Sequence, residues 1–248
     1  MIPKKIHYCW FGGKPLPRLA KKCIKSWKKY LPDYEIIRWD ESNFDVNIIP
    51  YTKEAYEAKK YAFVSDYARF WILYKEGGIY FDTDVEVIKS FKDIIDAGPF
   101  MGRELTFEEA KTRGKIGVNP GLGLGVFPGH IFFHEMLDLY SNIHFPNSDN
   151  TNNPTTVVTY TTEALLKYGL KNTTSIQKVI DINIYPSDYF SPLSFITKKL
   201  TITNNTHSIH LFAGSWISRK TKMLRYLDQK YPVLLYSLVT LKKFILRK

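Results

Sequence analysis

Short apolar runs alternate with amphipathic stretches at the start of the chain. Residues 5–11 and 34–39 each predict a buried strand, because each is a short apolar run next to turn-forming residues. Residues 17–30 predict a helix between these strands, since their apolar positions recur at helical spacing. The side chains expected on its inner face are Leu19, Cys23, Ile24 and Trp27.

A second helix is predicted over residues 62–75, which contain no glycine or proline. It ends at Gly77-Gly78, where a left-handed C-cap favours a residue without a Cβ. Residues 79–81 then predict a third short strand. This order of strand, helix, strand, helix and strand is typical of an α/β fold with parallel strand pairing.

The helix over residues 62–75 carries charged residues on its inward face. Ala62, Asp66, Arg69 and Leu73 lie four, three and four residues apart, which places them on one side of a helix. Asp66 and Arg69 form either an ordinary intrahelical ion pair or a polar contact for a ligand. The second interpretation suits sugar hydroxyls, because an inward-facing acid and arginine need polar partners.

Two carboxylates, Asp82 and Asp84, follow the third predicted strand with one residue between them. They therefore emerge at the carboxyl end of a strand, where ligands of open α/β sheets usually bind. Two acids so close repel each other unless a cation lies between them, and Mg²⁺ or Mn²⁺ suits carboxylates together with phosphate oxygens. The alternative for an isolated pair of this kind is a solvated turn.

Residues 116–129 contain five glycines and two prolines. A dinucleotide loop is rejected, because the required strand, turn and helix spacing with a later acid is absent. The glycines either form turns or let the backbone approach a bound sugar, with Asn119 as a polar contact. Residues 146–156 are rich in Asn, Thr, Ser and Pro and predict a loop over the site.

A chain of 248 residues suits one α/β domain. Cys9 and Cys23 are too few for a disulfide framework, so both are expected to be small buried thiols. No Cys/His spacing predicts structural zinc.

The net charge of +11 is concentrated at the two ends. Residues 1–30 and 218–248 are strongly basic, whereas the middle of the chain is net acidic. No nucleic-acid recognition motif accompanies this charge, so an anionic membrane surface is the expected partner and nucleic acid is not. The start lacks the apolar core of a signal peptide, and residues 233–241 are too short to span a bilayer, which favours a cytoplasmic location.

Three separated segments resemble one family. These are residues 2–13, residues 65–84 with the Asp-Thr-Asp sequence, and residues 208–216 with His210 and Gly-Ser-Trp. Together they resemble the bacterial capsular polysaccharide glycosyltransferases with a DXD sugar-binding region. These are similar to the yeast initiating α-1,6-mannosyltransferase of glycosyltransferase family 32 and, more distantly, to the clostridial glucosylating toxins. The chain departs from the usual Asn-Thr-Gly at Asn119-Pro120-Gly121, which puts the acceptor side in doubt.

The resemblance implies a single GT-A-like nucleotide-sugar-binding domain over residues 1–218, with a Rossmann-like mixed sheet flanked by helices. A basic amphipathic C-terminal helix is expected over residues 219–248. The implied reaction moves a hexose or N-acetylhexosamine from a nucleotide sugar, UDP-linked, to a growing surface polysaccharide or lipid-diphosphate-linked acceptor, with retention of configuration. The protein is then peripheral at the inner face of the cytoplasmic membrane.

The resemblance also assigns site residues. Asp82 and Asp84 bind Mn²⁺ or Mg²⁺, and Asp82 alternatively holds the donor ribose. His210 is expected as the third ligand, although a lone histidine is as often a packed strand residue. Trp10 stacks on the nucleotide base unless it belongs to the core. The expected groups on the donor sugar and phosphate are Asp66, Arg69, Asn119, Ser215 and Trp216.

Two other functions remain open from the sequence. A metal-dependent phosphohydrolase or phosphotransferase also uses paired aspartates, but it usually needs further clustered ligands, which are absent near Asp82. A non-catalytic sugar- or lipid-binding peripheral protein has no need of a leaving-group clamp, so the combination of Asp82, Asp84, His210 and the Ser-Trp pair argues against it.

Overall fold

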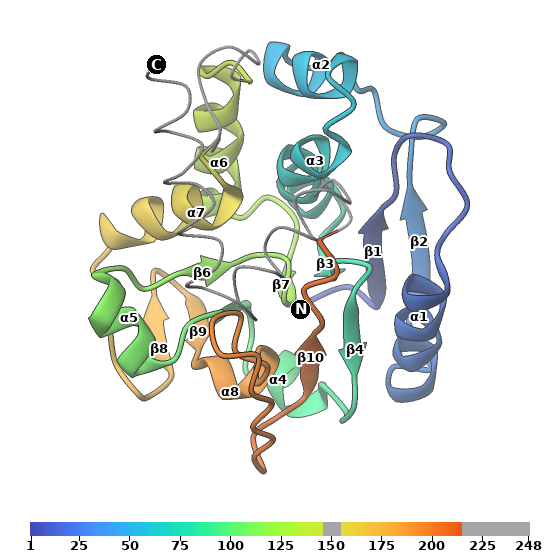
Figure 1. Ribbon diagram of the computed structural model, residues 1–248. Helices are drawn as coiled ribbons and strands as arrows, with labels where there is room; N and C mark the ends of the chain where they lie inside the picture. The colour runs from blue at the N-terminus through green and yellow to red at the C-terminus, as the bar shows by residue number, and fades with distance from the viewer. Residues whose placement is uncertain (146–154, 215–248) are drawn as a thin grey trace, which may run out of the picture. The chain divides into compact units, whose positions relative to one another are not determined.

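The sheet at the centre of the computed structural model has the strand order β2-β1-β3-β7-β5-β9-β8, with β6 paired to β5 (Figure 1). The structure describes residues 1–145 and 155–214. A separate antiparallel pair is formed by β4 and β10. The strands are β1 (Lys5–Cys9), β2 (Glu35–Trp39), β3 (Gly78–Tyr80), β4 (Val85–Val87), β5 (Phe100–Arg103), β6 (Val118–Asn119), β7 (Leu124–Val126), β8 (Gln177–Val179), β9 (Ile182–Tyr185) and β10 (Ser208–His210).

Helices cover both faces of the sheet, and each face has its own apolar core. One core joins the sheet to α2, α3, α6 and α7, and the other joins it to α1, α4 and α8 (Figure 1). The alternation along β1 shows the two faces, since Cys9 belongs to the first core and Tyr8 to the second. The helices are α1 (Arg18–Tyr30), α2 (Pro50–Glu57), α3 (Tyr61–Glu76), α4 (Lys92–Asp96), α5 (Phe107–Arg113), α6 (Ile131–Ser141), α7 (Val157–Leu166) and α8 (Ser187–Phe190).

The predicted α/β class is confirmed, and the predicted elements of the first 81 residues are all present. β1 pairs in parallel with both β2 and β3, as the alternation predicts. α3 ends at Gly77, whose φ of 62° lies in the left-handed region. Cys9 and Cys23 are both buried free thiols, as expected. The inward face of α3 is also confirmed, with Asp66, Arg69 and Leu73 buried.

The glycine-rich segment differs from the sequence prediction, because residues 116–129 contain two short strands as well as turns. β7 pairs antiparallel with β3 and β5, which makes the sheet mixed. Gly125 permits this pairing because a Cβ there would lie 2.1 Å from the Phe100 ring. The missing side chain is therefore a packing requirement of the sheet centre.

The described part of the chain up to Phe212 forms one compact unit. The expected domain boundary at residue 218, the basic helix over residues 219–248 and most of the expected loop over residues 146–156 lie outside the described residues. No helix within residues 1–145 and 155–214 is long and apolar enough to cross a membrane.

Candidate active site

Asp82 lies in the turn between β3 and β4. The amide of Val85 donates to the carbonyl of Asp82 at 3.0 Å and closes this turn. The amide of Asp82 donates to the carbonyl of Gly121, also at 3.0 Å. A Cβ on Gly121 would lie 1.9 Å from Oδ2 of Asp82, so only glycine leaves room for the carboxylate in this position. The glycine-rich segment thus packs directly against the first aspartate of the DXD sequence.

The pairing of β4 with β10 brings Asp84 and His210 together. In the antiparallel register, His210 lies opposite Val85, which is the residue that follows Asp84. The amide of Leu211 donates to the carbonyl of Asp84 at 2.9 Å and extends the ladder by one bond. Nε2 of His210 lies 3.2 Å from Oδ1 of Asp84. Because a carboxylate only accepts, the imidazole donates in this contact.

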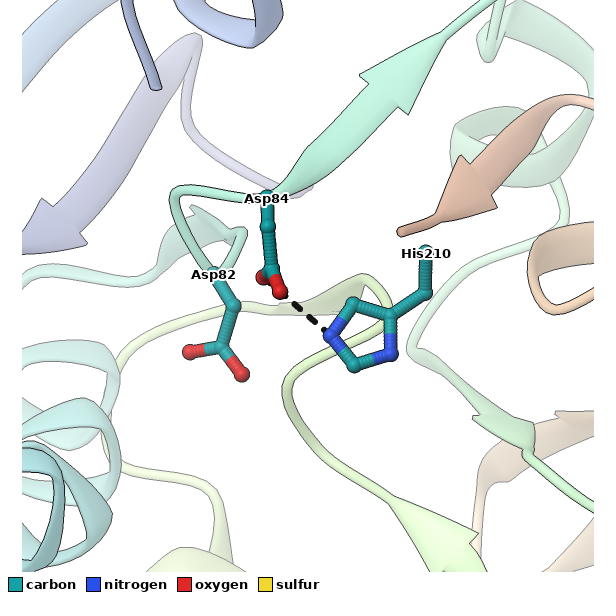
Figure 2. A group of neighbouring side chains, drawn as sticks. All are labelled: Asp82, Asp84 and His210. Atoms are coloured by element: carbon teal, nitrogen blue, oxygen red, sulfur yellow. Dashed lines mark hydrogen bonds and ion pairs between the residues drawn. The ribbon is translucent and has the colours of Figure 1, made fainter. Parts of the chain in front are cut away.

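Asp82, Asp84 and His210 converge on one point (Figure 2). One ligand atom of each residue lies within 4.8 Å of the others. Nδ1 of His210 is buried and has no hydrogen-bond partner among the described residues. Nε2 is the imidazole nitrogen that faces the acids, and two carboxylates with an imidazole nitrogen form a set of donors that fits a divalent cation. The structure therefore brings together the three residues that were expected as metal ligands from the sequence.

The charge around His210 also favours a cation. Burial lowers the pKa of His210, but Asp84, Asp82 and Glu104 together outweigh this effect, so that the pKa is raised overall. A histidine must be neutral to bind a metal, so a bound ion would take the place of this proton.

Arg69 links α3 to the DXD turn. Its Nη2 lies 2.8 Å from Oδ1 of Asp66 and 3.4 Å from Oδ1 of Asp82. Its Nε donates to the carbonyl of Ser65, and its guanidinium lies 4.8 Å from the centre of the Tyr80 ring. Nη1 of Arg69 is buried and has no partner among the described residues. The ion pair and the ligand contact predicted from the sequence are therefore compatible, since one nitrogen holds Asp66 and another is available.

Asp66 and Arg69 are almost completely buried. Burial raises the pKa of Asp66 to about 7, although Arg69 opposes this rise. Burial disfavours the charge on Arg69, but Asp82, Tyr80 and Asp66 raise its pKa overall. Arg69 therefore remains charged beside the two acids.

The side chain of Asn119 contacts the protein on both sides. Its Oδ1 accepts from the amide of Gly121 at 2.7 Å, and its Nδ2 donates to Oε2 of Glu104 at 3.0 Å. Glu104 could not be predicted from the sequence, because this residue belongs to no motif and lies 15 residues from Asn119. Only the fold brings this glutamate to the glycine-rich segment.

Trp10 follows β1 and is half-buried beside the core that contains α1. Its amide donates to the carbonyl of Trp39, and its Nε1 donates to the carbonyl of Lys14 at 2.6 Å. Gly12 and Gly13 then turn the chain with φ of 89° and 66°. The partly open indole is compatible with both interpretations from the sequence. Ser215 and Trp216, the other predicted donor contacts, lie outside the described residues.

The segment with the DXD sequence is similar to a known protein family. Residues 17–101 match the family described as glycosyltransferase sugar-binding region containing DXD motif. This region includes α3 and the turn with Asp82 and Asp84, whereas His210 lies beyond it.

Several individual proteins are also similar to this chain. An uncharacterized glycosyltransferase, L373 of Acanthamoeba polyphaga mimivirus, is 26% identical over 240 residues, which cover 93% of this chain and 90% of that protein. Inositol phosphoceramide mannosyltransferase 3 of Schizosaccharomyces pombe is 39% identical over 88 residues, covering 34% of this chain and 24% of that protein. Among solved structures, PaToxG glycosyltransferase has a TM-score of 0.50 at 22% identity, covering 67% of this chain and 69% of that one.

The solved structure supports the GT-A-like fold. The family match over residues 17–101 and these relatives show that the chain is similar to glycosyltransferases with a DXD region.

Proposed function

We propose that this glycosyltransferase depends on a divalent metal and moves a hexose or N-acetylhexosamine from a UDP-linked sugar to a saccharide acceptor. The observation that carries the proposal is the convergence of Asp82, Asp84 and His210 beside Arg69. The acceptor we propose is a growing surface polysaccharide or an oligosaccharide on a lipid diphosphate, as in the bacterial capsular enzymes that the sequence resembles.

Mn²⁺ or Mg²⁺ is the proposed cofactor, held by Asp82, Asp84 and His210. Carboxylate oxygens suit both ions, and the imidazole nitrogen favours Mn²⁺. When bound, such an ion acts as a Lewis acid for the negative charge that grows on the departing diphosphate. Because two of the three residues are anionic, they would supply the negative charge that a divalent cation needs at this site.

Asp66 and Arg69 are proposed to grip the donor sugar. The unpartnered Nη1 of Arg69 can donate to a hydroxyl while Nη2 stays on Asp66. Asp66 accepts from a hydroxyl when ionised and can donate one bond when protonated. Because both side chains are fixed by burial, they can orient the sugar with little loss of side-chain entropy on binding.

The remaining donor contacts extend along the nucleotide. Trp10 is proposed to stack on the base, and Asn119 to contact the donor from the glycine-rich segment. Ser215 and Trp216 would donate from hydroxyl and indole N–H to the β-phosphate. These donors add to the neutralisation of charge where it develops on the leaving group.

Retention of configuration is proposed from the resemblance to retaining enzymes. No residue is identified as a general base. A front-face transfer needs none, because the leaving phosphate itself can take the proton of the acceptor hydroxyl. Metal binding, donor binding and leaving-group stabilisation then account for the roles of the named residues.

A cytoplasmic, peripheral membrane location is proposed from charge. α1 carries six basic residues and no acid, and at 100° per residue they fall within about a third of its circumference. A row of exposed cations on one helix suits anionic headgroups, each basic residue contributing up to ~1 kcal/mol. The basic residues of α1 are Arg18, Lys21, Lys22, Lys25, Lys28 and Lys29.

A panel of UDP- and GDP-sugars tests the reaction. We expect slow Mn²⁺-dependent hydrolysis of one UDP-sugar that releases UDP and free sugar, and no release after chelation of the metal. Release of inorganic phosphate instead would favour the phosphohydrolase. Binding of sugars without any turnover in the presence of metal and acceptor would favour the non-catalytic binding protein.

A further inference from the structure

Glu104 follows β5 directly and faces the glycine-rich segment. Its amide donates to the carbonyl of Gly117 at 2.9 Å, which fixes its backbone against that segment. Its carboxylate accepts from Nδ2 of Asn119 at 3.0 Å. Nothing in the proposed reaction requires Glu104 to touch a substrate, yet its side chain is held beside the site.

Asn119 passes this contact on to the DXD turn. Its amide orientation is determined by its two partners, because the Gly121 N–H can only donate and the Glu104 carboxylate accepts. Asn119 is itself buried. The carbonyl of Gly121 in turn accepts from the amide of Asp82 at 3.0 Å. Glu104, Asn119, Gly121 and Asp82 therefore form one continuous chain of hydrogen bonds.

This chain of hydrogen bonds ends at Asp82, the most exposed of the three predicted metal ligands. The side chain of Asp82 is 29% exposed, against 16% for Asp84 and 9% for His210. Asp84 and His210 are fixed by the pairing of β4 with β10, whereas Asp82 lies in a turn. Tyr80 and Arg69 contact Oδ1 of Asp82. Oδ2 lies against Gly121, where a Cβ would overlap it, so the position of Gly121 determines the room available to Oδ2.

We infer that Glu104 and Asn119 are positioning residues that set the place of Asp82 for the metal through Gly121. The inference rests on the proposed metal function and extends it to residues that do not bind the ion. Partners that orient metal ligands typically change metal affinity about 10–100-fold when they are removed. Loss of either residue should therefore weaken metal binding while Asp82 itself is retained.

The test is isothermal titration of the full chain with MnCl₂ alone, so that no turnover is needed. Glu104→Ala removes the acceptor and should raise the Kd for Mn²⁺ by about 10–100-fold. Glu104→Gln keeps an oxygen for Asn119 and should bind close to wild type. Glu108→Ala, at an exposed glutamate in the first turn of α5, is the matched control and should also bind like wild type.

A donor–acceptor exchange separates positioning from a general effect on folding. Asn119→Asp alone sets two carboxylates against each other and should weaken Mn²⁺ binding. The double variant Glu104→Gln/Asn119→Asp restores one donor and one acceptor at unchanged net charge, since the new amide at position 104 can donate to the new carboxylate at position 119. Its affinity should return towards the wild-type value.

Wild-type affinity in Glu104→Ala, or a double variant that binds no better than Asn119→Asp alone, would overturn the positioning role and leave the metal site intact. A wild-type protein that bound no Mn²⁺ would overturn the metal assignment and the positioning role together. The two failures are therefore distinguishable in one set of titrations.

Discussion

Arg69 forms ion pairs with two acids of the candidate site, Asp66 and Asp82. It contacts Asp66 and Asp82 with one nitrogen, and all three are at least partly buried. Without the guanidinium, the two carboxylates that approach the same nitrogen would repel each other. The stability of the fold and the shape of the site therefore depend on the same guanidinium.

Arg69→Met should destabilise the protein by about 3–5 kcal/mol, because it leaves a buried acid without its partner. Urea unfolding followed by circular dichroism measures the change. The double variant Asp66→Asn/Arg69→Met should recover part of the loss, since an amide replaces the buried carboxyl that has lost its partner. A loss below ~1 kcal/mol in the single variant would show that this ion pair adds no more to stability than a surface pair does.

Trp10→Ala should weaken UDP binding by about 1–3 kcal/mol, the range for base stacking on aromatic residues. The half-buried indole should contribute less to stability than a core tryptophan does. Nucleotide titration and thermal unfolding on the same samples separate the two effects. Unchanged affinity together with a stability loss of ~3–5 kcal/mol would assign Trp10 to the core.

At the level of the secondary structure, α1 supports β4, the strand that begins directly after Asp84. Nε1 of Trp27 donates to the carbonyl of Val85 at 2.8 Å, and Oγ of Ser26 accepts from the amide of Val87 at 2.9 Å. β4 has only three residues and pairs with only one strand, β10, among the described residues. Its backbone is therefore completed by side chains of a helix.

Trp27→Phe should cost about 1–3 kcal/mol, chiefly because it leaves the buried Val85 carbonyl without its donor. Thermal or urea unfolding measures this loss. Trp39→Phe is the comparison, since the Nε1 of Trp39 donates to the His7 side chain in a half-buried position away from β4. If Mn²⁺ binding is weakened by Trp27→Phe but not by Trp39→Phe, the role of α1 in supporting the site is established. Equal Mn²⁺ binding would limit Trp27 to packing.

Elements with long periodic patterns could be predicted from the sequence, whereas the short strands of the glycine-rich segment could not. α1 and α3 carry clear helical spacing, and Gly77 marks the end of α3. β6 and β7 have only two and three residues, flanked by glycines and prolines. Such segments become strands only through partners far away in the sequence, here β3 and β5.

The same distinction holds for the candidate site. Asp82 and Asp84 could be predicted because they follow a recognisable strand, and Asp66 and Arg69 because they share a helical face. His210 was assigned through the family resemblance, since its nearness to Asp84 depends on a pairing between segments 126 residues apart in the sequence. Glu104 has no local signal, so its contact with Asn119 appears only in the folded structure.

For the whole molecule, the basic residues of α1 and the basic sequence of residues 218–248 predict binding to anionic vesicles. The triple variant Lys21→Gln/Lys25→Gln/Lys28→Gln should sediment less with phosphatidylglycerol vesicles at low salt than wild type does, because it removes half of the cations of α1. The matched control changes Lys53, Lys75 and Lys111 to Gln, which alters net charge equally at exposed sites elsewhere.

A chain ending near residue 219 should also sediment less, since it lacks the basic C-terminal residues. All forms should leave the vesicles at high salt. If the α1 variant, its control and the shortened chain all sediment like wild type, the proposed membrane contact is wrong. An equal loss in the α1 variant and the control would show that net charge alone is responsible.

UDP-sugar turnover against Mn²⁺ concentration, compared between wild type and Asp84→Asn, tests the proposed metal-dependent transfer most directly. This change removes one charge at the metal cluster and almost no volume. We predict saturable Mn²⁺-dependent turnover in wild type, its loss in Asp84→Asn with an unchanged thermal midpoint, and normal turnover in the exposed control Asp33→Asn. Wild-type turnover in Asp84→Asn, or turnover in wild type that persists after metal removal, would contradict the account.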